Sequence, residues 1–182
     1  MRARPAATLF FLLGCAFLFA QSNKTPDAQL PGVADSTYVP VHKFDPKRDA
    51  AADIQAAIAE AHRAGKRILL DVGGDWCQYC HEMDRLFQDH PELLELRDKS
   101  FITVAVYYGE DKKNEQVLSH YPKVEGIPHF YVLDSRGSVL HSQHLLELRK
   151  GGKYDPDKIK EFLTKWSPSA PESVRKTGNE IP

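Results

Sequence analysis

The feature that most constrains the fold is a short apolar segment that runs directly into two cysteines. Residues 67–72, RILLDV, are mostly apolar, and Gly73-Gly74 ends the run. An apolar run of this length that ends in glycines is typical of a buried strand rather than of a helix. Cys77 and Cys80 follow it, and the residues after them have a helical pattern. We therefore expect a strand that leads to a cysteine pair at the start of a helix.

The rest of the chain alternates between helical and strand patterns. Asp45-Pro46 offers an N-cap followed by proline, which predicts a helix that runs to Gly65. The break at His90-Pro91 predicts that the helix after the cysteines is kinked or split. The later segments predict a strand at 101–108, a short helix at 114–120, a hairpin of 129–133 with 138–141, and a capped helix from Asp155-Pro156. This order predicts an α/β fold of three layers, with a central mixed sheet flanked by helices.

Composition excludes several classes of protein. The 182 residues suit one domain with extensions at its ends, because domains cluster at roughly 100 to 150 residues. With 24 basic against 25 acidic residues, the chain has no basic footprint for nucleic acid. Three cysteines are too few for a scaffold held together by disulfides. The chemistry must therefore be sought in local groups of residues.

The amino terminus has the layout of a secretory signal peptide, which we place at residues 1–20. Arg2 and Arg4 precede an uncharged apolar run, residues 5–20, and a polar stretch follows. The run of 16 residues is shorter than the roughly 20 needed to span a bilayer. We expect a secreted or periplasmic protein, with an uncleaved membrane anchor as the alternative. Leu-Leu-Gly-Cys, which ends at Cys15, resembles a lipoprotein processing box, so lipidation there would also tether the chain.

The remaining sequence divides into three parts. Residues 21–44 contain Pro, Asp and Ser without a sustained period, which predicts a linker. Residues 45–166 hold all the predicted strands and helices and form the expected domain. Residues 167–182, again Pro- and Ser-containing, predict a loose tail.

The cysteine pair predicts redox chemistry if its first member lies at the start of a helix. A cysteine in the first turn meets unpaired N–H groups and the positive end of the helix dipole, and both favour the thiolate. The thiolate attacks disulfides, and a second thiol three positions on can resolve the mixed disulfide. We therefore assign Cys77 as the nucleophile and Cys80 as the resolving thiol.

Two segments resemble the thioredoxin superfamily. RILLDVGGDWCQYCHEM resembles its active-site segment, and GIPHFYVLDSRGSVL resembles its cis-proline loop and the following hairpin. The resemblance covers about residues 50–166 and implies a thioredoxin-like fold with thiol–disulfide exchange, which uses no dissociable cofactor and no metal. It also implies roles for further residues. These are Trp76 and the loop residues Ile127 and Pro128 as substrate contacts, and Asp71 as a buried proton acceptor for Cys80.

The sequence departs from the archetype of the superfamily between and after the cysteines. Gln78-Tyr79 replaces Gly-Pro, and His81 replaces Lys. The segment looks closer to extracytoplasmic members with a Cys-x-x-Cys-His sequence. Such a resemblance implies protein thiols and disulfides as substrates, and a membrane electron-donor or oxidant protein as partner.

Three other interpretations of the pair stay open. Cys77-x-x-Cys80-His81 is also the attachment motif of c-type haem, and it would need a second histidine as axial ligand. Structural zinc needs four ligands, and no second cysteine pair exists. A thioredoxin-fold binding module without enzymatic activity would keep the pair oxidised.

Other charged and aromatic residues have structural interpretations. We expect His81 on a helix surface, Tyr107-Tyr108 at the core and its edge, and Arg149-Lys150 as ordinary solvated charge.

Overall fold

The computed structural model of the protein describes residues 38–111 and 113–168. The expected signal peptide at 1–20, Cys15, residues 21–37 of the expected linker and residues 169–182 of the expected tail lie outside the described residues. Within the part that is described, no helix is both long enough and apolar enough to cross a membrane.

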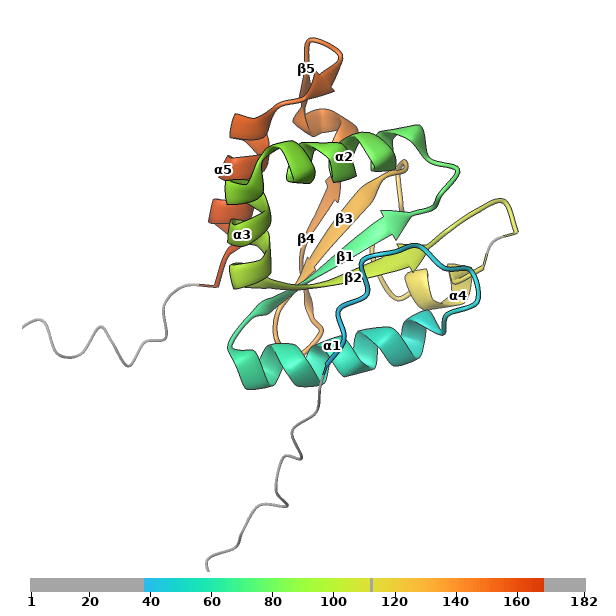
Figure 1. The fold of residues 1–182 in the computed structure, drawn as a ribbon. Helices are drawn as coiled ribbons and strands as arrows, with labels where there is room; N and C mark the ends of the chain where they lie inside the picture. The colour runs from blue at the N-terminus through green and yellow to red at the C-terminus, as the bar shows by residue number, and fades with distance from the viewer. Residues whose placement is uncertain (1–37, 112, 169–182) are drawn as a thin grey trace, which may run out of the picture. The chain divides into compact units, whose positions relative to one another are not determined.

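A four-stranded mixed sheet forms the centre of the domain (Figure 1). Its strands are β1 (Arg67–Gly73), β2 (Phe101–Tyr107), β3 (His129–Leu133) and β4 (Val139–His144), in the order β2-β1-β3-β4. The β1 and β2 strands are parallel, while β3 is antiparallel to both β1 and β4. The predicted mixed sheet is therefore confirmed.

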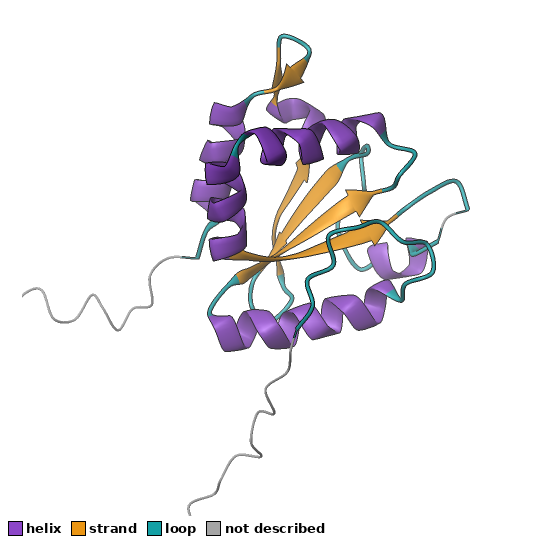
Figure 2. Cartoon of the chain, in the orientation of Figure 1, coloured by secondary structure: helices purple, strands orange, loops and turns teal. Residues whose placement is uncertain are grey.

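Helices cover both faces of this sheet, as Figure 2 shows. On one face lie α1 (Ala50–Ala64) and the short α4 (Glu115–Leu118), and on the other lie α2 (Gln78–Asp89), α3 (Pro91–Ser100) and α5 (Pro156–Trp166). Successive side chains of a strand point to opposite faces. Accordingly, Ile68 and Leu70 pack in the core beneath α1, whereas Leu69 packs in the core beneath α2, α3 and α5. The predicted three layers are confirmed.

The observed helix ends test the capping and break signals that were read from the sequence. Asp155 caps α5 as predicted, and the helix after the cysteines is split between Asp89 and Pro91. The prediction that Asp45-Pro46 begins a helix is wrong. The Asp45 carboxylate accepts the N–H of Lys47 in a turn, and Asp49 caps α1 through the N–H of Ala52.

The segment before α1 contributes to the core. Val41 forms an isolated parallel bridge with Val104, and its carbonyl accepts the N–H of Ala105 at 2.7 Å. Phe44 is buried in the same core as α1. The boundary between linker and domain at residues 44 and 45 stays a prediction, but the packed region reaches back at least to Val41.

A small hairpin between β4 and α5 was not predicted. After the 3₁₀ helix Leu145–Leu148, strands β5 (Arg149–Lys150) and β6 (Lys153–Tyr154) pair across a turn of two glycines with positive φ. The expectation that Arg149 is ordinary solvated charge is wrong. Its guanidinium lies 4.5 Å from the Tyr79 ring centroid and 5.0 Å from that of Tyr154, and it pairs with the Glu82 carboxylate.

We predict that Arg149 stabilises the packing of this hairpin on α2. Replacing Arg149 by Ala removes the two ring contacts and leaves the half-buried Glu82 carboxylate without its cation. The expected loss of unfolding free energy is about 2 kcal/mol, measured by urea unfolding of the oxidised protein. The neighbouring Lys150→Ala variant is the control, because an exposed charge changes stability by less than about 0.5 kcal/mol. Equal stabilities of the two variants would contradict the assignment.

Candidate active site

The turn after β1 places Cys77 at the start of α2. After Gly73, a turn closes with the N–H of Cys77 donating to the Gly74 carbonyl at 2.9 Å. Cys77 is the N-cap residue of α2, and its sulfur accepts the N–H of Cys80 at 3.1 Å. The sulfur therefore occupies the place of an N-cap side-chain oxygen, at the positive end of the helix dipole. This environment stabilises negative charge on the Cys77 sulfur.

Cys77 and Cys80 are joined by a disulfide, with their Cα atoms 5.2 Å apart. Both residues are buried, with 4% of each exposed. The end of β1 fits closely against the pair. A Cβ atom at position 73 would lie 2.6 Å from the Cys80 sulfur and 2.9 Å from the Phe44 ring. The glycine at position 73 is therefore required for this close approach of strand and disulfide.

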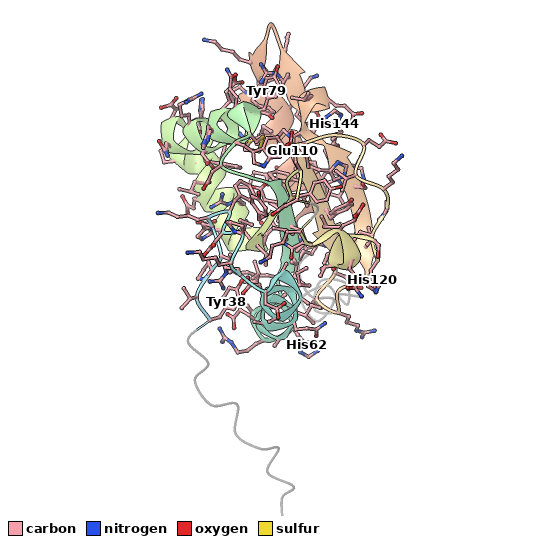
Figure 3. All side chains as sticks on the ribbon, turned by 90° about the vertical axis from the view of Figure 1, so that its right-hand side faces the viewer. Tyr38, His62, Tyr79, Glu110, His120 and His144 are labelled. Atoms are coloured by element: carbon pink, nitrogen blue, oxygen red, sulfur yellow. A yellow bond between two sulfur atoms is a disulfide. The ribbon has the colours of Figure 1, made fainter. Side chains whose placement is uncertain are left out.

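Two exposed aromatic side chains flank the buried sulfurs. Trp76 precedes Cys77 and is 58% exposed, and Tyr79 lies between the cysteines and is 40% exposed. Large apolar side chains at such exposure next to a reactive group are typical of a contact surface for another molecule. Figure 3 shows Tyr79 at the same end of the domain as Glu110 and His144, with His62 and His120 at the other end.

Asp71 lies on β1, on the face of the sheet that α2, α3 and α5 cover. Its register partner on β3 is Phe130, and both Phe130 and Leu69 belong to the core on that face. Burial and, to a smaller extent, the nearby carboxylate of Asp84 on α2 together raise the pKa of the Asp71 carboxyl to about 7, against a smaller opposing effect of Arg97. A carboxyl with this pKa exchanges a proton close to neutral pH, as a general base does.

Two further titratable groups, Asp84 and His81, lie on α2. Burial raises the pKa of Asp84, while the charges of His81 and Arg97 lower it. The Nε2 of His81 donates a hydrogen bond to the Asp75 carbonyl at 2.8 Å. His81 is thus held against the turn that carries Trp76.

The loop before β3 has the backbone form that the resemblance implied. The Ile127–Pro128 peptide bond is cis, and the Pro128 carbonyl accepts the N–H of Leu145 at 3.1 Å. Ile127 lines the same cavity as Trp76. The structure therefore brings together Trp76 and Ile127, which are far apart in the sequence.

His129, directly after Pro128, was not singled out by the sequence as a residue of the site. It is 2% exposed, pairs in register with His144 on β4, and its Nε2 lies 2.7 Å from the Ser142 hydroxyl. Burial and, to a smaller extent, the charge of His144 together lower the pKa of His129 to about 4. The His129 imidazole, directly after the cis-proline bond, is therefore neutral at neutral pH. Its position directly after Ile127-Pro128 was the sequence signal that could have identified His129 as a residue of the site.

Arg149 and Asp84 were also missed. Neither had a sequence signal, because each is defined by contacts between segments that are distant in the chain. Among residues 38–111 and 113–168, no group of three or more His, Cys, Asp or Glu side chains is placed to hold a metal ion.

The comparison with protein families identifies the fold. The family model described as Thioredoxin-like matches residues 49–135, which include Asp71, the cysteine pair and the cis-proline loop. Among solved structures, a disulphide isomerase from Xylella fastidiosa Temecula1 is similar with a TM-score of 0.59 and 27% identity, over 70% of this chain and 98% of that one. The oxidised C-terminal domain of Neisseria meningitidis DsbD has the same fold, with a TM-score of 0.51 and 24% identity, over 65% of this chain and 96% of that domain.

Curated relatives have similar sequences over part of their length. The thiol:disulfide interchange protein DsbD of Pseudomonas fluorescens is 30% identical over 117 residues, which are 64% of this chain and 18% of that protein. The protein of the same name from Colwellia psychrerythraea is 22% identical over 57% of this chain and 17% of its own length. The chain thus spans less than a fifth of either relative.

The resemblance stated from the sequence is confirmed by the family match and by the fold. The chain contains a thioredoxin-like domain that carries the cysteine pair of a thiol–disulfide oxidoreductase.

Proposed function

We propose that the protein exchanges disulfides with protein substrates outside the cytoplasm, with Cys77 attacking and Cys80 resolving. The observation that carries this proposal is the position of the Cys77 sulfur. It caps α2, where a thiolate is stabilised, and it is bonded to a second cysteine one turn further along the same helix. Two curated relatives are thiol:disulfide interchange proteins, which supports the same chemistry.

The first step is attack on a substrate disulfide by the reduced pair. The Cys77 thiolate forms a bond to one substrate sulfur, and the other substrate sulfur leaves as a thiolate that takes up a proton. The product is a mixed disulfide between Cys77 and the substrate. The N–H of Cys80, which donates to the Cys77 sulfur in the oxidised pair, stabilises the attacking thiolate in the same position.

The second step releases the substrate. The Cys80 thiol gives up its proton, attacks the Cys77 sulfur, and displaces the remaining substrate sulfur as a thiolate. The substrate gains two electrons and the pair loses two, which regenerates the disulfide. Asp71 is the proposed proton acceptor for Cys80, through a water molecule, and its pKa of about 7 suits this transfer. The same steps in reverse oxidise a substrate, so the potential of the redox partner sets the direction.

Three residues are the proposed contacts for the substrate chain. Trp76 and Ile127 line one cavity beside the pair, and the cis bond places Pro128 next to Ile127 in the same loop. Exposed aromatic surface at Trp76 offers apolar contact to the residues that flank the substrate cysteine.

The proposed location and partners follow from the sequence and the relatives. Residues 1–20 direct the chain to the periplasm or the exterior, with retention by an uncleaved anchor or by lipidation at Cys15 as the tethered alternative. Residues 21–44 link this segment to the domain of residues 45–166, and residues 167–182 form the tail. A membrane protein that donates or accepts electrons is the proposed partner.

Serine substitutions separate the roles of the two cysteines. We expect Cys77→Ser to lower the rate of exchange with a disulfide-bonded protein by about 100-fold or more, because the attacking thiolate is lost. We expect Cys80→Ser to accumulate a mixed disulfide with the substrate, because attack proceeds without resolution. Non-reducing electrophoresis and mass spectrometry of the adduct measure both results.

The Cys80→Ser adduct should join the substrate to Cys77. An adduct on Cys15, or full exchange activity in Cys77→Ser, would contradict the assignment. Unchanged function of the protein after both substitutions would instead support a binding module without enzymatic activity.

The Asp71 carboxyl should affect stability and rate in opposite ways. Its pKa is raised from an ordinary value of 3.8 to about 7, so from about pH 4 to 7 the carboxyl ionises in the unfolded chain but stays largely protonated in the folded one, and the protein loses stability as pH rises. The unfolding free energy of Asp71→Asn minus that of the wild type should be roughly 3 kcal/mol larger at pH 8 than at pH 4. The same variant should release substrate from the mixed disulfide about tenfold or more slowly at pH 7.

Urea unfolding at the two pH values and stopped-flow kinetics test this pair of effects. The exposed Asp157 of α5 is the control, because Asp157→Asn should show neither. A stability difference between Asp71→Asn and the wild type that does not change with pH would contradict the raised pKa.

A further inference from the structure

A cavity of about 620 Å³ opens beside Trp76, and we call it the Trp76 pocket. Its volume lies within the roughly 300–1,000 Å³ that is usual for ligand sites. The residues that line it come from the cysteine turn, the loop after β2 and the cis-proline loop. They are Trp76, Tyr107, Tyr108, Gly109, Glu110, Asp111 and Ile127.

The parallel pairing of β1 and β2 builds one wall of the pocket. Gly73 pairs in register with Tyr107, so the loop that leaves β2 lies at the same edge of the sheet as the cysteine turn that leaves β1. The N–H of Tyr108 donates to the Gly73 carbonyl at 2.7 Å, and the Asn114 side-chain amide donates to the Tyr107 carbonyl at 2.8 Å. This wall is therefore fixed to the strand ends that position the disulfide.

The walls of the Trp76 pocket are apolar and aromatic, but its charge is negative. Trp76 is 58% exposed, and Tyr107, Tyr108 and Ile127 are partly exposed. Glu110 and Asp111 are both exposed, and they are the charged groups among its described lining residues. Lys113, two positions after Asp111, does not line it. Figure 3 shows Glu110 at the same end of the domain as Tyr79.

The opposite side of the cysteine pair carries positive charge. Arg149, which stacks on Tyr79, is paired with Glu82, but Lys150 and Lys153 lie exposed on the same hairpin and carry the positive charge of this side. A cationic side chain of a substrate is therefore repelled on the Tyr79 side and attracted on the Trp76 side. Aromatic faces beside carboxylates suit a side chain with an apolar stem and a cationic head. Arginine meets both requirements, since its planar guanidinium stacks on rings and pairs with carboxylates.

We propose that the Trp76 pocket selects protein substrates in which an arginine flanks the reacting cysteine. The arginine side chain enters between Trp76 and Tyr108, and Glu110 and Asp111 pair with its guanidinium. This inference rests on the proposed function, because the pocket acts while Cys77 exchanges with the substrate cysteine. Glu110 and Asp111 are then specificity-determining residues for the exchange.

Peptides that differ only in charge test the proposal. Each peptide carries one cysteine as a mixed disulfide with glutathione, and both neighbours of that cysteine are arginine, citrulline or glutamate. Citrulline has nearly the shape of arginine without its charge. The pre-reduced full chain is mixed with each peptide at pH 7 and low salt, and Cys77→Ser supplies the background rate.

We expect the arginine peptide to react about fivefold to tenfold faster than the citrulline peptide, and the glutamate peptide to react most slowly. In the double variant Glu110→Gln and Asp111→Asn, the ratio of the arginine rate to the citrulline rate should fall to about one. Glu161→Gln on α5, which removes an exposed carboxylate elsewhere, should keep the wild-type ratio. Added salt should also reduce the ratio, because it screens exposed charges.

Two results would overturn the inference and leave the proposed function intact. One is equal rates for the three peptides, and the other is glutathione disulfide reacting as fast as the arginine peptide. A different result would overturn the proposed function itself: no peptide reacts above the Cys77→Ser background although mass spectrometry shows Cys77 to be reduced.

Discussion

The hydrogen bond from the Cys80 N–H to the Cys77 sulfur links the reactive cysteine to the fold of this domain, because it holds that sulfur at the start of α2. It exists because β1 ends at Gly73 and the turn that follows places Cys77 as the N-cap of α2. The parallel register of β1 with β2 holds the same edge of the sheet in place and brings the loop of Tyr107 beside it. The disulfide, the exposed Trp76 and the cis-proline loop all depend on this edge.

The burial of the Asp71 carboxyl lowers the stability of the folded protein. Asp71 is a carboxyl between the apolar residues Leu70 and Val72 of β1, and burial raises its pKa to about 7. A buried carboxyl that must ionise near neutral pH destabilises the folded protein. A purely structural role for Asp71 would give no reason for this loss of stability. The proposed role in deprotonating Cys80 gives this carboxyl a reason to be buried.

The exposed surroundings of the pair differ on its two sides. A hairpin with Arg149 covers Tyr79 on one side, whereas the other side has the open Trp76 pocket with Glu110 at its edge. The sulfurs themselves are almost fully buried. In the proposed exchange, a partner protein presents its cysteine to this surface, and the proposed selection among substrates uses aromatic contact and charge.

The central elements could be predicted from the sequence, because their signals are local and strong. The apolar run of β1, the cap at Asp155 and the break at Pro91 each act within a few residues. The start of α1 was misplaced, since Asp45 and Asp49 offer similar caps and only the folded chain shows which N–H each accepts.

Features that depend on contacts between distant segments could not be predicted. The strands β5 and β6 have two residues each, too few for a periodic pattern. The ion pair of Arg149 with Glu82 joins residues 67 positions apart. In the site, the cysteines and Asp71 could be found from the sequence because they lie on one strand and the helix that follows it. The effect of Asp84 on the pKa of Asp71 and the acidic side of the Trp76 pocket could be found only from the folded structure.

The redox equilibrium of the cysteine pair tests the account most directly. The full chain is equilibrated with thiol–disulfide buffers of set potential, and mass spectrometry measures the alkylated fractions of Cys77 and Cys80. The account predicts one reversible two-electron transition, in which both cysteines change together, with a midpoint between about −270 and about −120 mV. A pair that stays oxidised throughout this range, or two cysteines that titrate independently, would contradict it.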